Sequence, residues 1–177
     1  MITKIYEFLD YNIEPKIITL DRSETEYKIL YEYEITIDDE PDNILGLKNY
    51  IVIITLFKKI NTIKIDYDLK KNILLKRTGT LTNKFNMPMI LANVSGVIKK
   101  WALLDEVKDI ELNSIILATN KSKDNDTRRY NIYKYYMKKL GIKIINEIDI
   151  TEEHKNSTIQ QSIIKLNIEP ILVKDLI

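Results

Sequence analysis

Few side chains in this sequence stand at spacings that would support catalysis, and each has a plainer structural interpretation. Asp66 and Asp68 flank Tyr67, so two carboxylates would point to one face of a strand and could share a divalent metal. In a chain with 30% charged residues, a solvated strand face explains the same pattern. His154 is the only histidine, which excludes sites that need two imidazoles and argues against most zinc enzymes. We therefore predict no bound metal.

Cations and aromatic rings alternate between Arg128 and Lys139 (RRYNIYKYYMKK). Exposed tyrosines could stack on bases while the cations hold phosphates. Alternatively, an amphipathic helix could bury Tyr130, Tyr133 and Met137 and leave its basic face in solvent. We favour the helix, because 27 Lys and Arg against 26 Asp and Glu leave a net charge of only +1. That balance argues against nucleic acid and anionic membranes as partners.

Composition excludes further classes. The chain of 177 residues has no cysteine, and so no disulfide, thiolate metal site or cysteine nucleophile. The longest apolar run, residues 50–57, is far short of the roughly 20 residues that span a bilayer. The first residues carry acidic groups and no apolar signal core, which predicts a cytoplasmic protein. Abundant Ile, Lys and Asn with few Gly and Pro are typical of an AT-rich genome, as in some viruses, phages and low-GC bacteria.

The elements that must position these residues divide the chain into two halves of a single domain, 1–177. The first half, 1–93, alternates apolar and polar residues, which predicts mainly strands. Ile63, Ile65 and Tyr67, for example, alternate with polar residues. Strands are predicted at 16–20, 27–37, 50–57, 63–69, 73–76, 80–82 and 89–93.

The second half, 94–177, has a helix-strand-helix-strand rhythm. Val97, Trp101 and Leu104 recur at helical spacing, which predicts a helix after Ser95-Gly96, with Trp101 in the core. A second helix is predicted to end at Gly141 as its C-terminal cap. Strands are predicted at 114–119, 142–148 and 159–168. The fold class is therefore α+β, with a mixed, mainly antiparallel sheet and helices packed on it.

The order of the second half, roughly residues 87–168, resembles the GNAT family, the Gcn5-related N-acetyltransferases. In that family a strand runs into an Arg/Gln-x-x-Gly-x-Gly/Ala loop that opens a helix. The matching residues here are 93–98 (NVSGVI), with Gly96 in place, Asn at the first position and Ile98 at the last. The resemblance implies an acetyl-CoA site whose pyrophosphate lies on the backbone of Ser95, Gly96, Val97, Ile98 and Lys99. It also implies a contribution from Asn120 at the end of the next strand.

The next helix ends Tyr-Met-Lys-Lys-Leu-Gly-Ile, which resembles the family's Tyr-x-x-Leu-Gly-Phe. That tyrosine commonly serves as general acid to the leaving thiolate. Met137 occupies the matching position, and Tyr136 lies one residue away, rotated by about 100° around the helix. The resemblance implies Tyr136 as the acid, provided that the helix register shifts.

Two functions follow as hypotheses. One is a divergent N-acetyltransferase that moves an acetyl group from acetyl-CoA to a primary amine on a small molecule or protein. The other is a non-enzymatic α+β protein-interaction module, viral or phage-derived, whose cofactor loop has decayed, as Ile98 and Met137 suggest. The second predicts an exposed apolar or tyrosine-rich surface for a protein partner, and the sequence also leaves open a homodimer.

Overall fold

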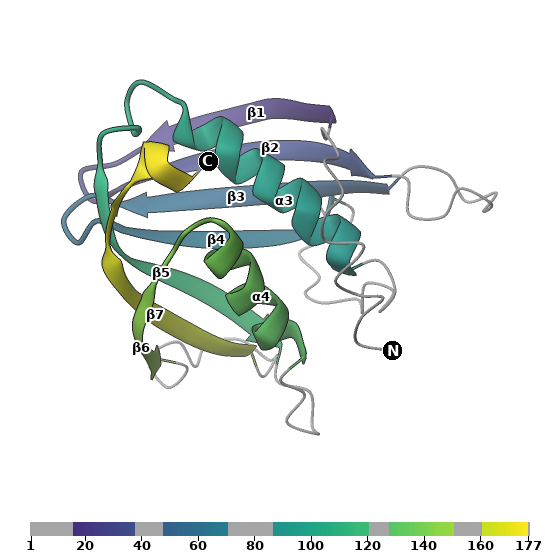
Figure 1. The fold of residues 1–177 in the computed structure, drawn as a ribbon. Helices are drawn as coiled ribbons and strands as arrows, with labels where there is room; N and C mark the ends of the chain where they lie inside the picture. Colours follow the sequence, from purple (N-terminus) through teal and green to yellow (C-terminus); the bar gives the residue numbers. More distant parts are fainter. Residues whose placement is uncertain (1–15, 38–47, 71–86, 121–127, 151–160, 177) are drawn as a thin grey trace.

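One mixed sheet with two helices against it makes up the described part of the protein. The computed structural model describes residues 16–37, 48–70, 87–120, 128–150 and 161–176. Its elements are β1 (Lys16–Glu24), β2 (Lys28–Ile37), β3 (Lys48–Phe57), β4 (Thr62–Leu69), α3 (Met87–Ala102), β5 (Glu111–Asn120), α4 (Arg128–Lys139), β6 (Ile144–Asp149), β7 (Gln161–Leu172) and the 3-10 helix η2 (Val173–Leu176). The strand order is β1-β2-β3-β4-β5-β7-β6 (Figure 1).

The first four strands form an antiparallel meander, as the alternating pattern predicts. In β2, Tyr31, Tyr33 and Ile35 are at most 2% exposed and face the helices. β3 has buried residues on both of its faces, which explains why its sequence is a continuous apolar run. The predicted strands at 16–20, 27–37, 50–57 and 63–69 are confirmed.

The second half of the sheet begins with a change of direction. β4 and β5 are parallel, whereas β5 pairs antiparallel with β7, and β7 with β6. The predicted α+β class is confirmed, and every other neighbouring pair among the described strands is antiparallel. The strands expected at 114–119, 142–148 and 159–168 are also confirmed.

β7 continues past Pro170, where we expected it to stop. The ladder between β5 and β7 shifts register between Leu112 and Ser114, and Asn113 donates its backbone N–H to Asn61 instead. Proline has no N–H to contribute to a ladder, so a break in the pairing is a position that tolerates it.

α3 corrects the sequence analysis. Residues 89–93 are helical, not a strand, and the helix begins at Met87 rather than after Gly96. Ile90, Val94 and Val97 are buried against the sheet. Their spacing is that of one helix face, and it begins in the first turns of α3. Pro88 fits the first turn of a helix, where a backbone N–H has no partner to lose. Trp101, near the C-terminal end, is fully buried as predicted.

α4 ends as the sequence predicts. Gly141 has a positive φ of 74°, which only glycine adopts without strain. Its N–H donates to the carbonyl of Lys138, and the N–H of Ile142 donates to that of Met137. This pair of bonds is the Schellman arrangement that closes a helix. The turn leads directly into the edge strand β6.

Both helices lie on one face of the sheet and enclose a single cluster of buried apolar side chains (Figure 1). Within the described part of the chain, neither helix is long and apolar enough to cross a membrane. The predicted strands at 73–76 and 80–82 and the residue His154 lie outside the described residues.

Candidate active site

The parallel strands β4 and β5 stay together for only four residue pairs, from Thr62 and Ser114 to Ile65 and Leu117. Beyond that point both remain strands, β4 to residue 69 paired with β3, and β5 to residue 120 paired with β7. No pairing joins 66–69 to 118–120, and the two strands diverge in Figure 1. We call the space between these two segments the β4–β5 gap.

A cavity of about 30 Å³ lies where the gap begins. Its lining comes from both strands and both helices: Ile65, Tyr67, Leu91, Val94, Ser95, Ile98, Leu117, Tyr133, Tyr136, Met137 and Leu140. One water needs roughly 10–15 Å³ by a comparable measure. The cavity therefore has room for a group of acetyl size, whereas a larger ligand would have to extend outside it.

Three tyrosines and one serine supply the polar groups of this mainly apolar lining. The hydroxyls of Tyr67 and Tyr133 lie 2.7 Å apart in a hydrogen bond between β4 and α4. Tyr67 belongs to the part of β4 that no longer pairs with β5, so this bond joins that part of β4 to α4. A phenol can donate one proton and accept hydrogen bonds, so either hydroxyl can be the donor in this bond.

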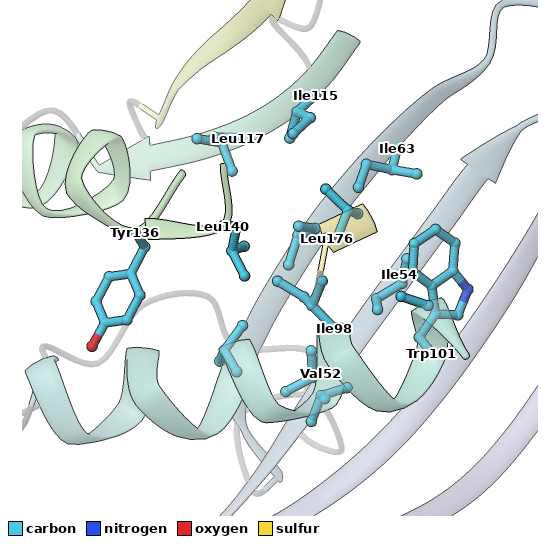
Figure 2. Close-up of a cluster of buried hydrophobic side chains, with 14 of the residues drawn as sticks. Val52, Ile54, Ile63, Ile98, Trp101, Ile115, Leu117, Tyr136, Leu140 and Leu176 are labelled. Carbon is cyan, nitrogen blue, oxygen red and sulfur yellow. The ribbon is translucent and has the colours of Figure 1, made fainter. Parts of the chain in front are cut away.

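Tyr136, the acid that the resemblance implies, lines the same cavity and is 6% exposed. Its ring extends from α4 toward α3 in Figure 2. It meets the ring of Tyr135 edge-on, with the ring centroids 6.0 Å apart. The buried face of α4 is thus wider than predicted, because Tyr136 joins Tyr133, Met137 and Leu140 in it.

The prediction of a pyrophosphate-binding loop at residues 95–99 is wrong, because these residues are helical. Residues Ser95 to Lys99 lie in the second half of α3, where backbone N–H groups donate to carbonyls four residues earlier. Such groups cannot cradle a phosphate, because only the first turn of a helix leaves N–H groups without an intrahelical acceptor. Ser95 and Ile98 instead line the cavity with their side chains. Gly96, Val97 and Lys99 do not, and Lys99 is exposed.

Asn120 ends β5 as expected and pairs with Gln161 of β7. Its backbone therefore lies at the open end of the gap. The connection from β4 to α3, residues 71–86, lies outside the described residues.

Asp66 and Asp68 do not contribute to this site. They alternate with Tyr67 along β4, so they point to the opposite face of the sheet, and Asp66 forms an ion pair with Lys64 at 2.9 Å. Within the described ranges, no group of three His, Cys, Asp or Glu side chains could ligate a metal.

The burial of Tyr133 and Met137 confirms the amphipathic interpretation of α4 over base stacking at these residues. Lys134 pairs with Glu147 of β6, and Lys138 and Lys139 are exposed. The side chains of Arg128, Arg129 and Tyr130 lie outside the described part of the protein.

Tyr67 is the site residue that the sequence analysis missed as a functional group. The signal was present: Tyr67 falls on the apolar face of its strand, in phase with Ile63 and Ile65. A hydroxyl on a core-facing position needs a partner. The sequence could not reveal that this partner is Tyr133, 66 residues later.

No family model, curated protein or solved structure matches this chain.

Proposed function

We propose that this protein is a divergent N-acetyltransferase that transfers an acetyl group from acetyl-CoA to a primary amine. The observation that carries the proposal is the β4–β5 gap, which opens from a small, mainly apolar cavity whose lining includes three tyrosines. This combination offers a place for an extended chain and, at its inner end, a place for a small acyl group.

The gap suits the pantetheine arm of coenzyme A. Strand edges that lack a neighbour present N–H and C=O groups, and extended ligands with amides pair with such edges as an added strand would. Among the described strands, segments 66–69 and 118–120 have no strand partner on the sides that face the β4–β5 gap. An arm laid between them would direct its thioester toward Ile65 and Leu117, where the strands meet.

The cavity suits the acetyl group. Ile98, Met137 and Leu140 give it an apolar wall, and its volume of about 30 Å³ limits the acyl chain to a short one. Acetyl-CoA would supply an activated acyl carbon to the attacking amine. The chain would supply orientation, exclusion of water and a hydroxyl proton for the leaving sulfur. Tyr136 is the donor that the family resemblance implies.

Ligand-dependent thermal unfolding tests the proposal. Acetyl-CoA or CoA at 100 times its dissociation constant should stabilise the protein by about 2.7 kcal/mol, which raises Tm by roughly 2–4 °C or somewhat more. Ser95→Phe should fill the cavity and abolish the rise, whereas Lys100→Phe, on the exposed side of α3, should retain it. Release of thiol in the presence of amines then measures turnover. No rise with either ligand would contradict the proposal.

A second candidate, a protein-interaction module without catalysis, is favoured by the two edges of the sheet. β1 exposes Ile18 and Leu20 at 45% and 44%, and β6 exposes Ile145 and Ile148 at 63% and 44%. Exposed apolar edge strands are where another chain, including a second copy, can pair. Light scattering over a range of concentrations should then detect an oligomer that Ile145→Lys with Ile148→Lys dissociates. A monomer at all concentrations would exclude the homodimer.

A further inference from the structure

We infer that the hydroxyl of Ser95 donates a hydrogen bond to the carbonyl oxygen of the acyl group in the cavity. This inference rests on the proposed acetyltransferase function and deepens it, because it assigns the residue that recognises the acyl carbonyl. Two observations carry it together. Ser95 lies on the face of α3 that lines the cavity, and its side chain has no hydrogen-bond partner among the described residues.

Ser95 is the polar member of an otherwise apolar stripe on α3. The helix gives the lining four residues at the spacing of one helix face, namely Leu91, Val94, Ser95 and Ile98. A serine side chain carries its hydroxyl one carbon from the backbone. A serine on this face therefore brings a hydroxyl to a wall that its neighbours make apolar.

The hydroxyl of Ser95 is not committed elsewhere. A serine inside a helix often bonds to the carbonyl four residues earlier, which here belongs to Leu91. In the part of the chain that the structure describes, Ser95 makes neither this bond nor another through its side chain. The three tyrosines of the lining, by contrast, have partners of their own. Ser95 can therefore turn to a ligand without breaking an existing bond.

A thioester carbonyl is an acceptor that suits this hydroxyl. An arm laid in the β4–β5 gap would bring its thioester to Ile65 and Leu117, and both residues line the cavity with Ser95. The carbonyl oxygen is the one strong hydrogen-bond acceptor of an acetyl group. Burying this oxygen in a mainly apolar cavity without a hydrogen bond is costly. Ser95 would supply the bond, while Met137 and Leu140 offer apolar surface to the methyl group.

The same bond should become stronger during transfer. The amine nitrogen forms a bond to the acyl carbon, and an electron pair of the carbonyl moves to its oxygen. Ser95 keeps its proton and donates a charge-assisted hydrogen bond to that negative oxygen. The carbonyl then reforms and the bond from carbon to sulfur breaks. The amine nitrogen gives one proton to water, and the departing sulfur receives one from the general acid, so no oxidant, reductant or metal takes part.

The first experiment measures binding without an amine acceptor. In S-ethyl-CoA a methylene replaces the carbonyl of acetyl-CoA, so the ratio of the two dissociation constants reports the contribution of the carbonyl oxygen. The wild-type protein should prefer acetyl-CoA by about two- to tenfold, the value of one neutral hydrogen bond. Ser95→Ala should remove this preference and bind S-ethyl-CoA no more weakly than the wild-type protein does.

The matched control is Ser23→Ala, which makes the same atomic change at an exposed position of β1. Two strands separate β1 from β4, so this variant should keep the preference for acetyl-CoA. Alanine has the highest helix propensity, so Ser95→Ala should fold. Circular dichroism and thermal unfolding check this. Ser95→Cys is a second variant in which a weak donor replaces the hydroxyl, and its preference should fall below that of the wild-type protein.

The second experiment measures turnover of acetyl-CoA with an amine. Ser95→Ala should lower kcat by about 100-fold or more, as loss of one donor to a developing negative oxygen does. Its KM should change by no more than the binding ratio, because the bond gains most of its strength in the transition state. A side chain that only packs against the ligand would not produce this split between kcat and KM.

The outcomes separate this inference from the proposed function. A wild-type protein that binds the two ligands equally overturns the assignment of Ser95 alone, and so does a Ser95→Ala protein that keeps either the preference for acetyl-CoA or the full kcat. In these cases coenzyme binding still supports the acetyltransferase proposal. A wild-type protein that binds neither ligand overturns that proposal, and this assignment with it.

Discussion

The hydroxyls of Thr62 and Ser114 lie 2.6 Å apart at the point where β4 and β5 begin to pair. Both side chains are buried, at 0% and 1% exposure. Thr62 also bonds to the carbonyl of Ile60, so its own proton is used there and Ser114 is the donor to Thr62. This bond lies at the end of the parallel pair opposite to the end where the gap begins.

Removing this bond should destabilise the fold unequally. Ser114→Ala leaves Thr62 with its partner at Ile60 and should cost about 1 kcal/mol of unfolding free energy. Thr62→Val removes both bonds and leaves the Ser114 hydroxyl buried without its partner, so we expect about 1–3 kcal/mol. Urea unfolding of both variants and of the double variant gives the coupling energy. Purely additive effects would contradict the bond.

An ionic network should make stability depend on pH at the acidic end. Arg22 donates to both carboxylate oxygens of Glu106, at 2.9 and 2.8 Å, and Tyr31 donates to the same carboxylate at 3.0 Å. Chiefly because of the bonds from Arg22, the pKa of Glu106 lies below its ordinary value of 4.5. This pKa is lower in the folded state, so its contribution is complete above 4.5 and is lost as pH falls through the folded value.

Glu106→Gln should therefore lower the unfolding free energy at pH 7 and have a smaller effect at a pH below 4.5. We expect at most about 1 kcal/mol, because the Arg22 and Glu106 side chains are 38% and 41% exposed and solvent screens them. Glu26→Gln, at the more exposed pair with Lys59, is the matched control and should change little. Urea unfolding at the two pH values measures the difference. An equal loss at both would contradict the network.

The end of α4 should be sensitive to the backbone conformation of Gly141 alone. A Cβ at this position would meet no atom within 4 Å, so substitution causes no clash. The positive φ nevertheless strains other residues, and Gly141→Ala should cost about 1 kcal/mol. Gly141→Asn should cost less, since asparagine tolerates this region. Thermal or urea unfolding measures both, and equal losses would point to a cause other than φ.

The wall of the cavity should set the length of the acyl group under the proposed function. Met137 is 4% exposed, so Met137→Ala should cost about 2–5 kcal/mol of stability and enlarge the cavity. Relative to acetyl-CoA, transfer from propionyl-CoA should improve by about tenfold or more, the value of one methylene in an apolar site. Lys138→Ala, one residue along and exposed, should alter neither quantity. A wild-type protein that uses both donors equally would exclude a size limit here.

Local pattern in the sequence determines most of the strands and the end of α4. Alternation in residues 29–35 follows from one buried sheet face, and Gly141 ends a helix through its own conformational freedom. The same kind of pattern misplaces the start of α3, although the helical periodicity begins at Ile90, because short apolar runs such as 89–93 fit a strand equally well. As a result, the predicted phosphate loop falls inside a helix.

Only the tertiary structure decided the site. The point at which β4 and β5 separate depends on which strands flank each of them. The pairing of these two strands joins residues 52 positions apart in the sequence, such as Thr62 and Ser114. The bond between Tyr67 and Tyr133 arises in the same way, because it joins β4 to α4 across 66 residues of the sequence. Local propensity fixes which face of an element is apolar, because that depends on neighbours in the chain. Which hydroxyls meet across the cavity depends on how separate elements pack, and no pattern within one element contains that information.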